Sequence, residues 1–141
     1  MITANGMHRI NLKGPWGFQP LEGLSSDSLP EAGTVKFPAA WQSFLGDFRG
    51  RTRFSRTFNC PTNLDAHERV NLLLDGVSGQ ARITLNGKLV GAIDNPAPPA
   101  RFDITQFLER HNQLQIEVQW EGAADQPGGL WAPVALEIIP S

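Results

Sequence analysis

The chain has 141 residues, of which 40% are hydrophobic, and carries a formal net charge of −2. This length fits one domain, which we place over residues 1–141, and the composition excludes a disordered chain. The slight acidity argues against a nucleic-acid partner, because phosphate binding needs an excess of Lys and Arg. The single cysteine, Cys60, excludes an internal disulfide.

In chain order, the region 17–40 is interpreted as irregular, with one short strand at 34–37. The second half of the chain holds segments in which apolar and polar residues alternate with a period of two. Such alternation predicts antiparallel strands with one buried face. These strands are expected at 70–74, 81–85, 114–120 and 134–138.

The dipeptide Asn86-Gly87 directly follows one of these strands and predicts a hairpin. A two-residue type I′ turn needs positive φ at both positions, which Asn and Gly tolerate best. The proline-rich segment 92–101 and the segment 122–129 are predicted to be loops.

Only the segment 103–110 is predicted to be helical, since Asp103 and Gln106 form a capping-box pattern. Long crossover helices are missing, which argues against a parallel α/β sheet. The pattern therefore predicts an all-β fold, a jelly-roll β-sandwich of two antiparallel sheets.

Four motifs follow one another along nearly the whole chain. Residues 10–18 read I-N-L-K-G-P-W-G-F, and residues 50–58 read G-R-T-R-F-S-R-T-F. The third motif runs from 70 to 91 and continues at 102–105 and 112–114, and the fourth, 128–136, begins G-G-L-W. In order and spacing they resemble the sugar-binding domain of family 2 glycoside hydrolases, which include β-galactosidases and β-glucuronidases. The resemblance implies a galactose-binding-like jelly roll.

In that family both catalytic carboxylates lie on a separate (β/α)₈ barrel, which needs about 200 residues or more. The carboxylates of this chain are scattered through turns and loops, without the facing pair that glycoside hydrolysis requires. We therefore expect no catalytic residue and no enzymatic activity in this domain.

In full-length relatives, two loops of the domain approach the active site of the barrel. They correspond here to Phe44–Gly50 and Glu121–Pro127. Carboxylates and amides there would bind sugar hydroxyls, an arginine would donate to them, and an indole would stack on a sugar ring. Ordinary polar loops and core packing are the alternative, and the arginine that usually follows the fourth-motif tryptophan is Ala132 here. The candidate ligand-binding residues are Trp41, Asp47, Arg49, Asp125, Gln126 and Trp131.

Trp16 and Trp120 are predicted to be core residues. The basic residues at 49–56 are interpreted as the polar face of one strand, except that Arg56 shares a face with Phe54 and Phe58. A buried Arg56 would need a carboxylate or carbonyl partner. We interpret it as an internal tether, with a ligand contact as the alternative.

The three histidines are isolated, so no zinc site is predicted. Asp94, Asn95 and Asp103 could hold a structural Ca²⁺, but turn formation explains them equally well. No cofactor is predicted.

Residues 1–13 lack the pattern of a signal peptide, which makes a cytoplasmic location the default. No stretch approaches the ~20 apolar residues of a membrane span, so we expect no membrane partner.

Three functional hypotheses follow from these features. The domain is a carbohydrate-binding module that takes a saccharide, a protein-interaction or structural domain that binds no sugar, or an accessory subunit of a glycoside hydrolase. An aromatic-lined groove with polar groups would favour the first, and a contiguous apolar patch the second.

Overall fold

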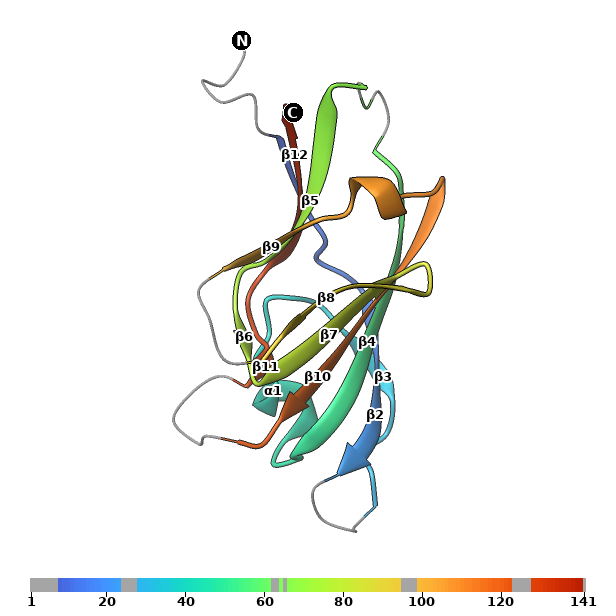
Figure 1. The fold of residues 1–141 in the computed structure, drawn as a ribbon. Coiled ribbons are helices and arrows are strands. Elements are labelled where there is room, and N and C mark those ends of the chain that lie inside the picture. Colours follow the sequence, from blue (N-terminus) through green and yellow to red (C-terminus); the bar gives the residue numbers. More distant parts are fainter. Residues whose placement is uncertain are drawn as a thin grey trace.

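The computed structural model describes residues 8–23, 28–61, 64, 66–94, 99–122 and 128–140. Within these residues the strands form two main antiparallel sheets that pack as a sandwich, together with a small third sheet (Figure 1). The predicted all-β sandwich is confirmed.

One main sheet has the order β1-β12-β5-β9 and the other the order β3-β2-β4-β10-β7-β8. The first contains β1 (His8–Asn11), β12 (Val134–Pro140), β5 (Glu68–Leu74) and β9 (Ala100–Asp103). The second contains β3 (Gly33–Val35), β2 (Trp16–Gly23), β4 (Gly50–Asn59), β10 (His111–Trp120), β7 (Gln80–Leu85) and β8 (Lys88–Ile93). The third sheet pairs β11 (Gly129–Leu130) with β6 (Val77–Ser78).

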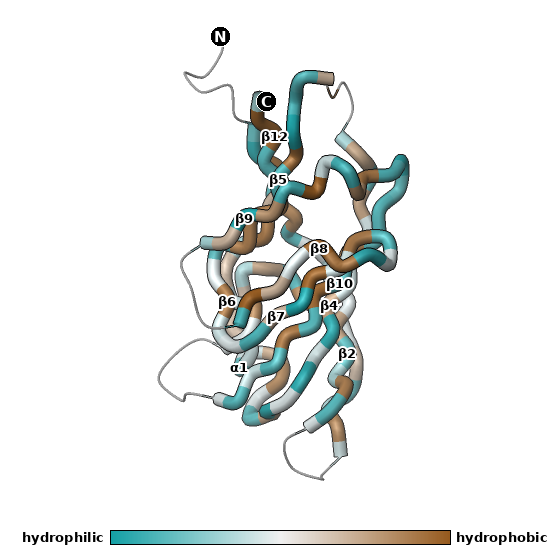
Figure 2. The backbone as a smooth tube through the Cα atoms, in the orientation of Figure 1, coloured by the Kyte–Doolittle hydropathy of each residue, from teal (hydrophilic) through white to brown (hydrophobic). Residues whose placement is uncertain are grey.

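The core lies between the two main sheets and is filled by the inward residues of each strand. Hydropathy alternates along β7 and β10, as the period-two pattern predicted (Figure 2). Trp16, Phe54 and Ile116 are completely buried, and Trp120 is 7% exposed. All four predicted strands of the second half of the chain are present, and Trp16 and Trp120 are core residues.

The first motif does not form one strand. Its residues divide between β1 and β2, which belong to different sheets, so the chain crosses the sandwich between Asn11 and Trp16. The interpretation of 17–40 as irregular is also wrong, because β2 extends to Gly23 and pairs with β4. The composition of β2 gives no strand signal, because Gly17, Pro20 and Gly23 are poor strand formers. Pairing with β4 holds them in the extended conformation.

Two further local predictions need correction. The segment 92–101 is not wholly a loop, because β8 reaches Ile93 and β9 begins at Ala100 and pairs with β5. The predicted helix at 103–110 is a single 3₁₀ turn, η1 (Thr105–Phe107). Asp103 does accept hydrogen bonds at its start, from the amide and hydroxyl of Thr105. A short helix that the pattern missed, α1 (Gln42–Leu45), precedes β4.

The hairpin turn at Asn86-Gly87 is confirmed. The φ angles are 55° at Asn86 and 81° at Gly87, and Leu85 pairs with Lys88 across the turn. The Asn86 side chain also ties the turn to the rest of the sheet. Its side-chain Nδ2 donates to the backbone carbonyl of Phe107 and to Oδ1 of Asn112. Its Oδ1 accepts from the backbone amide of Gln113.

Gly87→Val should destabilise the fold by about 1 kcal/mol or more, because a β-branched residue would be forced into a left-handed conformation. No heavy atom lies within 4 Å of a Cβ built at this position, so crowding cannot account for the loss. Lys88→Thr, on the adjacent strand, is the control. Equal urea midpoints for Gly87→Val and Lys88→Thr would contradict the assigned strain.

Candidate functional site

The two loops singled out in the sequence begin and end at one pole of the sandwich. We call this pole the loop end and define it as residues 41–50, 121–122 and 128–131. It lies opposite the pole where β1 pairs with the end of β12 (Figure 1). The indole of Trp41 is the packing centre of the loop end. It is completely buried, lies parallel to the ring of Phe48 at a centroid distance of 5.9 Å, and donates to the carbonyl of Phe48 at 2.7 Å.

Two glycines allow the chain to pass directly over the tryptophans. A Cβ at Gly128 would lie 2.5 Å from the ring of Trp120, and one at Gly129 would overlap the ring of Trp41. The backbone carbonyl of Gly128 accepts from the backbone amide of Trp41 at 3.1 Å. The backbone amide of Gly128 donates to Oε1 of Gln42 at 2.9 Å. These contacts join the segment that begins at 128 to α1.

The structure brings the edges of the two predicted loops together through Arg49. Its side chain lies against Gly122, where a Cβ would meet Nε of Arg49 at 2.6 Å. Arg49 and Asp47 are both exposed. The loop end therefore presents to solvent the guanidinium of Arg49, a donor, and the carboxylates of Asp47 and Glu121, which are acceptors.

The candidate tryptophans differ. Trp41 is buried and cannot present a ring face to a sugar, so the packing alternative describes it. Trp131 is 36% exposed, with one ring edge against Gly76. Among the described residues, no hydrogen bond, ion pair or ring contact joins Trp131 to Asp47 or Arg49. Asp125 and Gln126 lie outside the described residues.

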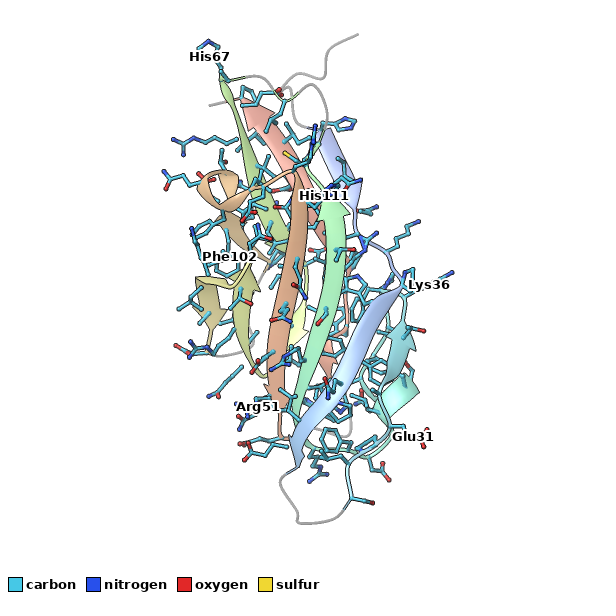
Figure 3. The ribbon with its side chains drawn as sticks, turned by 90° about the vertical axis from the view of Figure 1, so that its right-hand side faces the viewer. Glu31, Lys36, Arg51, His67, Phe102 and His111 are labelled. Atoms are coloured by element: carbon cyan, nitrogen blue, oxygen red, sulfur yellow. The ribbon has the colours of Figure 1, made fainter. Side chains whose placement is uncertain are left out.

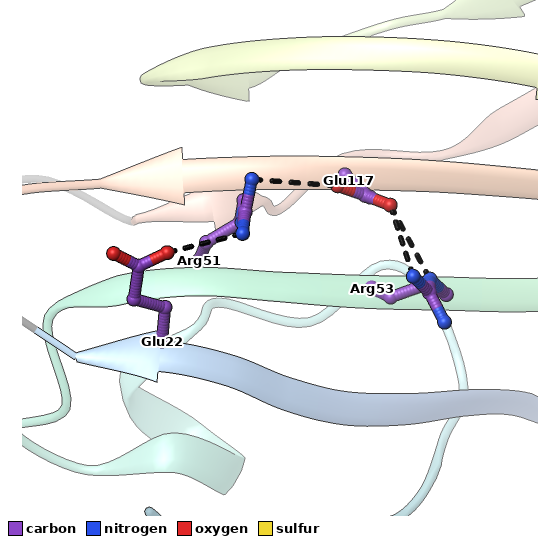
Figure 4. A network of polar contacts seen from close by, with 4 residues as sticks. All are labelled: Glu22, Arg51, Arg53 and Glu117. Atoms are coloured by element: carbon purple, nitrogen blue, oxygen red, sulfur yellow. Dashed lines mark hydrogen bonds and ion pairs between the residues drawn. The ribbon is translucent and has the colours of Figure 1, made fainter.

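Beside the loop end, the outer face of the six-stranded sheet carries a network of charged side chains (Figures 3 and 4). Arg51 binds Glu22 at 3.1 Å and approaches Glu117 at 3.9 Å, and Arg53 binds Glu117 at 3.2 Å. The interpretation of the arginine cluster as the polar face of one strand holds for Arg51 and Arg53.

A hollow of about 270 Å³ opens on this face between β4, β10, β7 and β8. Ala92 contributes a small side chain there, while the neighbouring strands carry long polar ones. This hollow could not be predicted from the sequence, because its residues meet only through the register of four strands. The only sign of these residues in the sequence was that they occupy the polar positions of the alternating segments. The polar lining consists of Arg51, Gln80, Arg82, Asp94, Glu117 and Gln119.

Arg56 points into the sandwich, as its spacing from Phe54 predicted. Its Nη1 atom is buried and finds no hydrogen-bond partner among the described residues. Burial lowers the pKa of this guanidinium. The expected internal tether is therefore not present in the described part of the chain.

On the outer face of the four-stranded sheet, the Glu137 side chain is only 3% exposed and binds Arg101 at 2.8 Å. The hydrogen bond from Arg101 to Glu137, and the attraction between their charges, raise the pKa of Arg101.

At the end of β9, the hydroxyl and amide of Thr105 lower the pKa of Asp103, and the charge and hydrogen bond of Arg69 add to the effect. The described residues contain no group of three His, Cys, Asp or Glu side chains placed to hold a metal ion. Asn95, one of the suggested calcium ligands, lies outside them. No helix in the described ranges is long and apolar enough to cross a membrane.

Comparison with known proteins assigns the fold to a family. The sequence profile of the glycosyl hydrolase 2 galactose-binding domain-like family matches residues 49–127, which is more than half of the chain. The chain belongs to this family. The resemblance inferred from the four motifs is confirmed.

Two curated relatives of this galactose-binding-like domain are β-mannosidases. The Mus musculus enzyme is 34% identical over 64 residues, and the Rattus norvegicus enzyme is 32% identical over 66 residues. These matches cover 45% and 47% of this chain, and 7% and 8% of the two enzymes.

Solved structures of β-glucuronidases contain the same fold. The FMN-binding β-glucuronidase of Facaelibacterium prausnitzii L2-6 superposes with a TM-score of 0.80 at 26% identity, over 96% of this chain and 23% of that one. The Bifidobacterium dentium β-glucuronidase superposes with a TM-score of 0.79 at 20% identity, over 100% of this chain and 31% of that one. The galactose-binding-like domain thus spans less than a third of each of these chains.

Thr105→Val should raise the pKa of Asp103 toward its usual value near 3.9, because the variant removes the hydroxyl that binds the carboxylate. A lowered pKa stabilises the fold above the unfolded-state pKa, and that stability is lost as the pH falls through the folded-state pKa. The stability advantage of the wild type over Thr105→Val should therefore shrink below about pH 4.

The carboxyl carbon of Asp103, followed by NMR during an acid titration, measures this shift. Thr105→Ser keeps the hydroxyl and is the control. An unchanged Asp103 titration in Thr105→Val would show that the hydroxyl does not hold the carboxylate.

Proposed function

We propose that this galactose-binding-like domain is a non-catalytic saccharide-binding module, and that it takes sugar at the loop end. The observation that carries the proposal is the junction of the two loops at Arg49 and Gly122, in a domain of this family. The exposed carboxylate of Asp47 would accept hydrogen bonds from sugar hydroxyls, and the guanidinium of Arg49 would donate them.

The remaining candidates would extend this site. Asp125 and Gln126 belong to the second loop and would add an acceptor and an amide. Trp131 keeps part of its ring in solvent and would pack on the apolar face of a pyranose. Trp41 would not contact the sugar. It would support the site by packing against Phe48 and the backbone at Gly129.

The charges of the domain support the non-catalytic part of the proposal. A glycosidase needs a carboxylic acid with a raised pKa opposite a second carboxylate. Three carboxylates here instead pair with arginines: Glu117 with Arg53, Asp103 with Arg69 and Glu137 with Arg101. Of these, Asp103 has its pKa lowered, first by Thr105 and further by Arg69, which favours the charged form that cannot deliver a proton.

The purified chain should release no chromogenic aglycone from aryl β-glucuronides, β-mannosides or β-galactosides. A glycoside hydrolase of this family, assayed in parallel on its own aryl glycoside, is the positive control. Release that a substitution at one Asp or Glu of this chain abolishes would overturn the non-catalytic assignment.

Titration of the ¹⁵N-labelled chain with galactosides, mannosides, glucuronides and plant oligosaccharides should shift the amide signals of Asp47, Arg49 and Gly122. We expect a dissociation constant on the order of 1 mM to 1 μM, which is about −4 to −8 kcal/mol for a solvent-exposed site. Arg49→Gln should weaken binding about tenfold through the loss of charged hydrogen bonds. Arg110→Gln, which changes an exposed arginine beyond the loop end, should leave it unchanged.

The small share of each relative that this domain covers favours a second candidate function. In this reading the domain acts beside a catalytic domain and turns the loop end toward its substrate, without holding a sugar alone. If no saccharide shifted any amide signal in this titration, the result would contradict the assignment as a saccharide-binding module. It would favour this second function.

A further inference from the structure

The hollow on the outer face of the six-stranded sheet has a lining suited to a ligand of its own. Three register pairs build it across neighbouring strands. Gln119 lies opposite Arg51 on one side and Gln80 on the other, and Glu117 lies opposite Arg82. Since residues opposite each other on one face are ~5 Å apart, these side chains converge on one small area.

One small residue of β8 lines the hollow. Ala92 is the register partner of Arg82 and points to solvent on β8, where a long side chain would fill the space. The volume of about 270 Å³ lies just below the ~300–1,000 Å³ of pockets for drug-sized molecules. A ligand of about one sugar ring matches this size.

The charges in the lining balance. Arg51 and Arg82 face Glu117 and Asp94, so two positive groups meet two negative ones. At the rim, Arg53 pairs with Glu117 at 3.2 Å and Glu22 pairs with Arg51 at 3.1 Å, which adds one group of each sign. A cation in the hollow would lie close to a repelling arginine, and an anion would lie close to a repelling carboxylate. The lining therefore disfavours both cations and anions.

The hydrogen-bonding groups of the lining are of both kinds. Guanidinium groups donate, carboxylates accept, and the amides of Gln80 and Gln119 do both. Within the described residues the side chains of Gln80, Arg82 and Asp94 have no hydrogen-bond or ion-pair partner, so their capacity is open to a ligand. A hydroxyl group donates and accepts at once, and a ring that carries several hydroxyls matches this mixture. The described residues of the lining include no aromatic ring, so recognition would rest on hydrogen bonds.

We propose that this hollow binds an uncharged, hydroxyl-rich ring, a neutral monosaccharide unit, as a second site independent of the loop end. Arg82 and Gln80 on β7 and Asp94 after β8 would contact the hydroxyls. Arg51, held between Glu22 and Glu117, would present its remaining donors in a fixed orientation.

The test is an NMR titration of the ¹⁵N-labelled chain with methyl β-galactoside, β-glucoside and β-mannoside, up to roughly 50 mM, well above a weak dissociation constant near 1 mM. We expect shifts in the side-chain amides of Gln80 and Gln119 and in the Nε–H of Arg82. Methyl β-glucuronide, which adds a carboxylate, should bind no more tightly than the neutral sugars.

Ala92→Phe should fill the hollow and weaken the binding about tenfold or more by blocking the hydrogen bonds. The fold should persist, because Ala92 is exposed and aromatic residues suit strands. Thr57→Phe adds the same ring to an exposed position of β4 outside the hollow and should leave binding unchanged. Arg82→Met removes the guanidinium donors but keeps an unbranched side chain, and it should also weaken binding.

The outcomes separate this site from the loop end. Shifts at Gln80, Gln119 and Arg82 that vanish in Ala92→Phe and persist in Arg49→Gln would support the hollow. Shifts confined to Asp47, Arg49 and Gly122 would support the loop end and overturn the hollow. No shift at the hollow with any neutral sugar, binding unaffected by Ala92→Phe, or binding of the glucuronide alone would also overturn it.

Discussion

The in-register pairing of β4 with β10 is the constraint on which the rest of the molecule depends. Ten consecutive residue pairs run without a bulge from Gly50 opposite Trp120 to Asn59 opposite His111. Because side chains alternate between faces, this ladder places Phe54 beside Ile116 in the core and Arg53 beside Glu117 in solvent. A slip by one residue would exchange the two faces and bury the arginines, which makes any other register very costly.

The ion pairs on the outer faces have a different role from the core. Exposed pairs such as Arg51 with Glu22 stabilise a fold by about 0–1 kcal/mol at most. Their effect is on geometry, since they hold long side chains in one orientation beside the hollow. Glu137 differs because its carboxylate is almost fully buried, and loss of Arg101 would leave that charge unpaired. The arginines of the six-stranded sheet therefore orient side chains on its surface. Arg101 of the four-stranded sheet instead neutralises the buried charge of Glu137.

Much of the fold could be predicted from the sequence because its central strands follow their own alternation. The strands β7, β10 and β12 and the Asn86-Gly87 turn carry this local signal. The strand β2 and the helix α1 carry none, because Gly17 and Pro20 are poor strand formers that are held by pairing with neighbouring strands, and α1 has only four residues. The place of Asp47 and Arg49 in the stretch just before β4 followed from the family resemblance. The burial of Trp41 and the hollow did not, since both depend on which strands become neighbours.

The pairing of β1 with β12 also determines how the domain would respond to tension. The strands are antiparallel, and His8 lies opposite Ile138 at the pole away from the loop end. A pull applied through the two ends of the described chain would therefore load the hydrogen bonds of this ladder one after another. The β1 strand would peel away from His8 toward Asn11, as a zipper opens, at low force. The long β4–β10 ladder lies outside this line of load, so the domain could lose its first strand while the surfaces at Arg49 and Arg82 kept their shape.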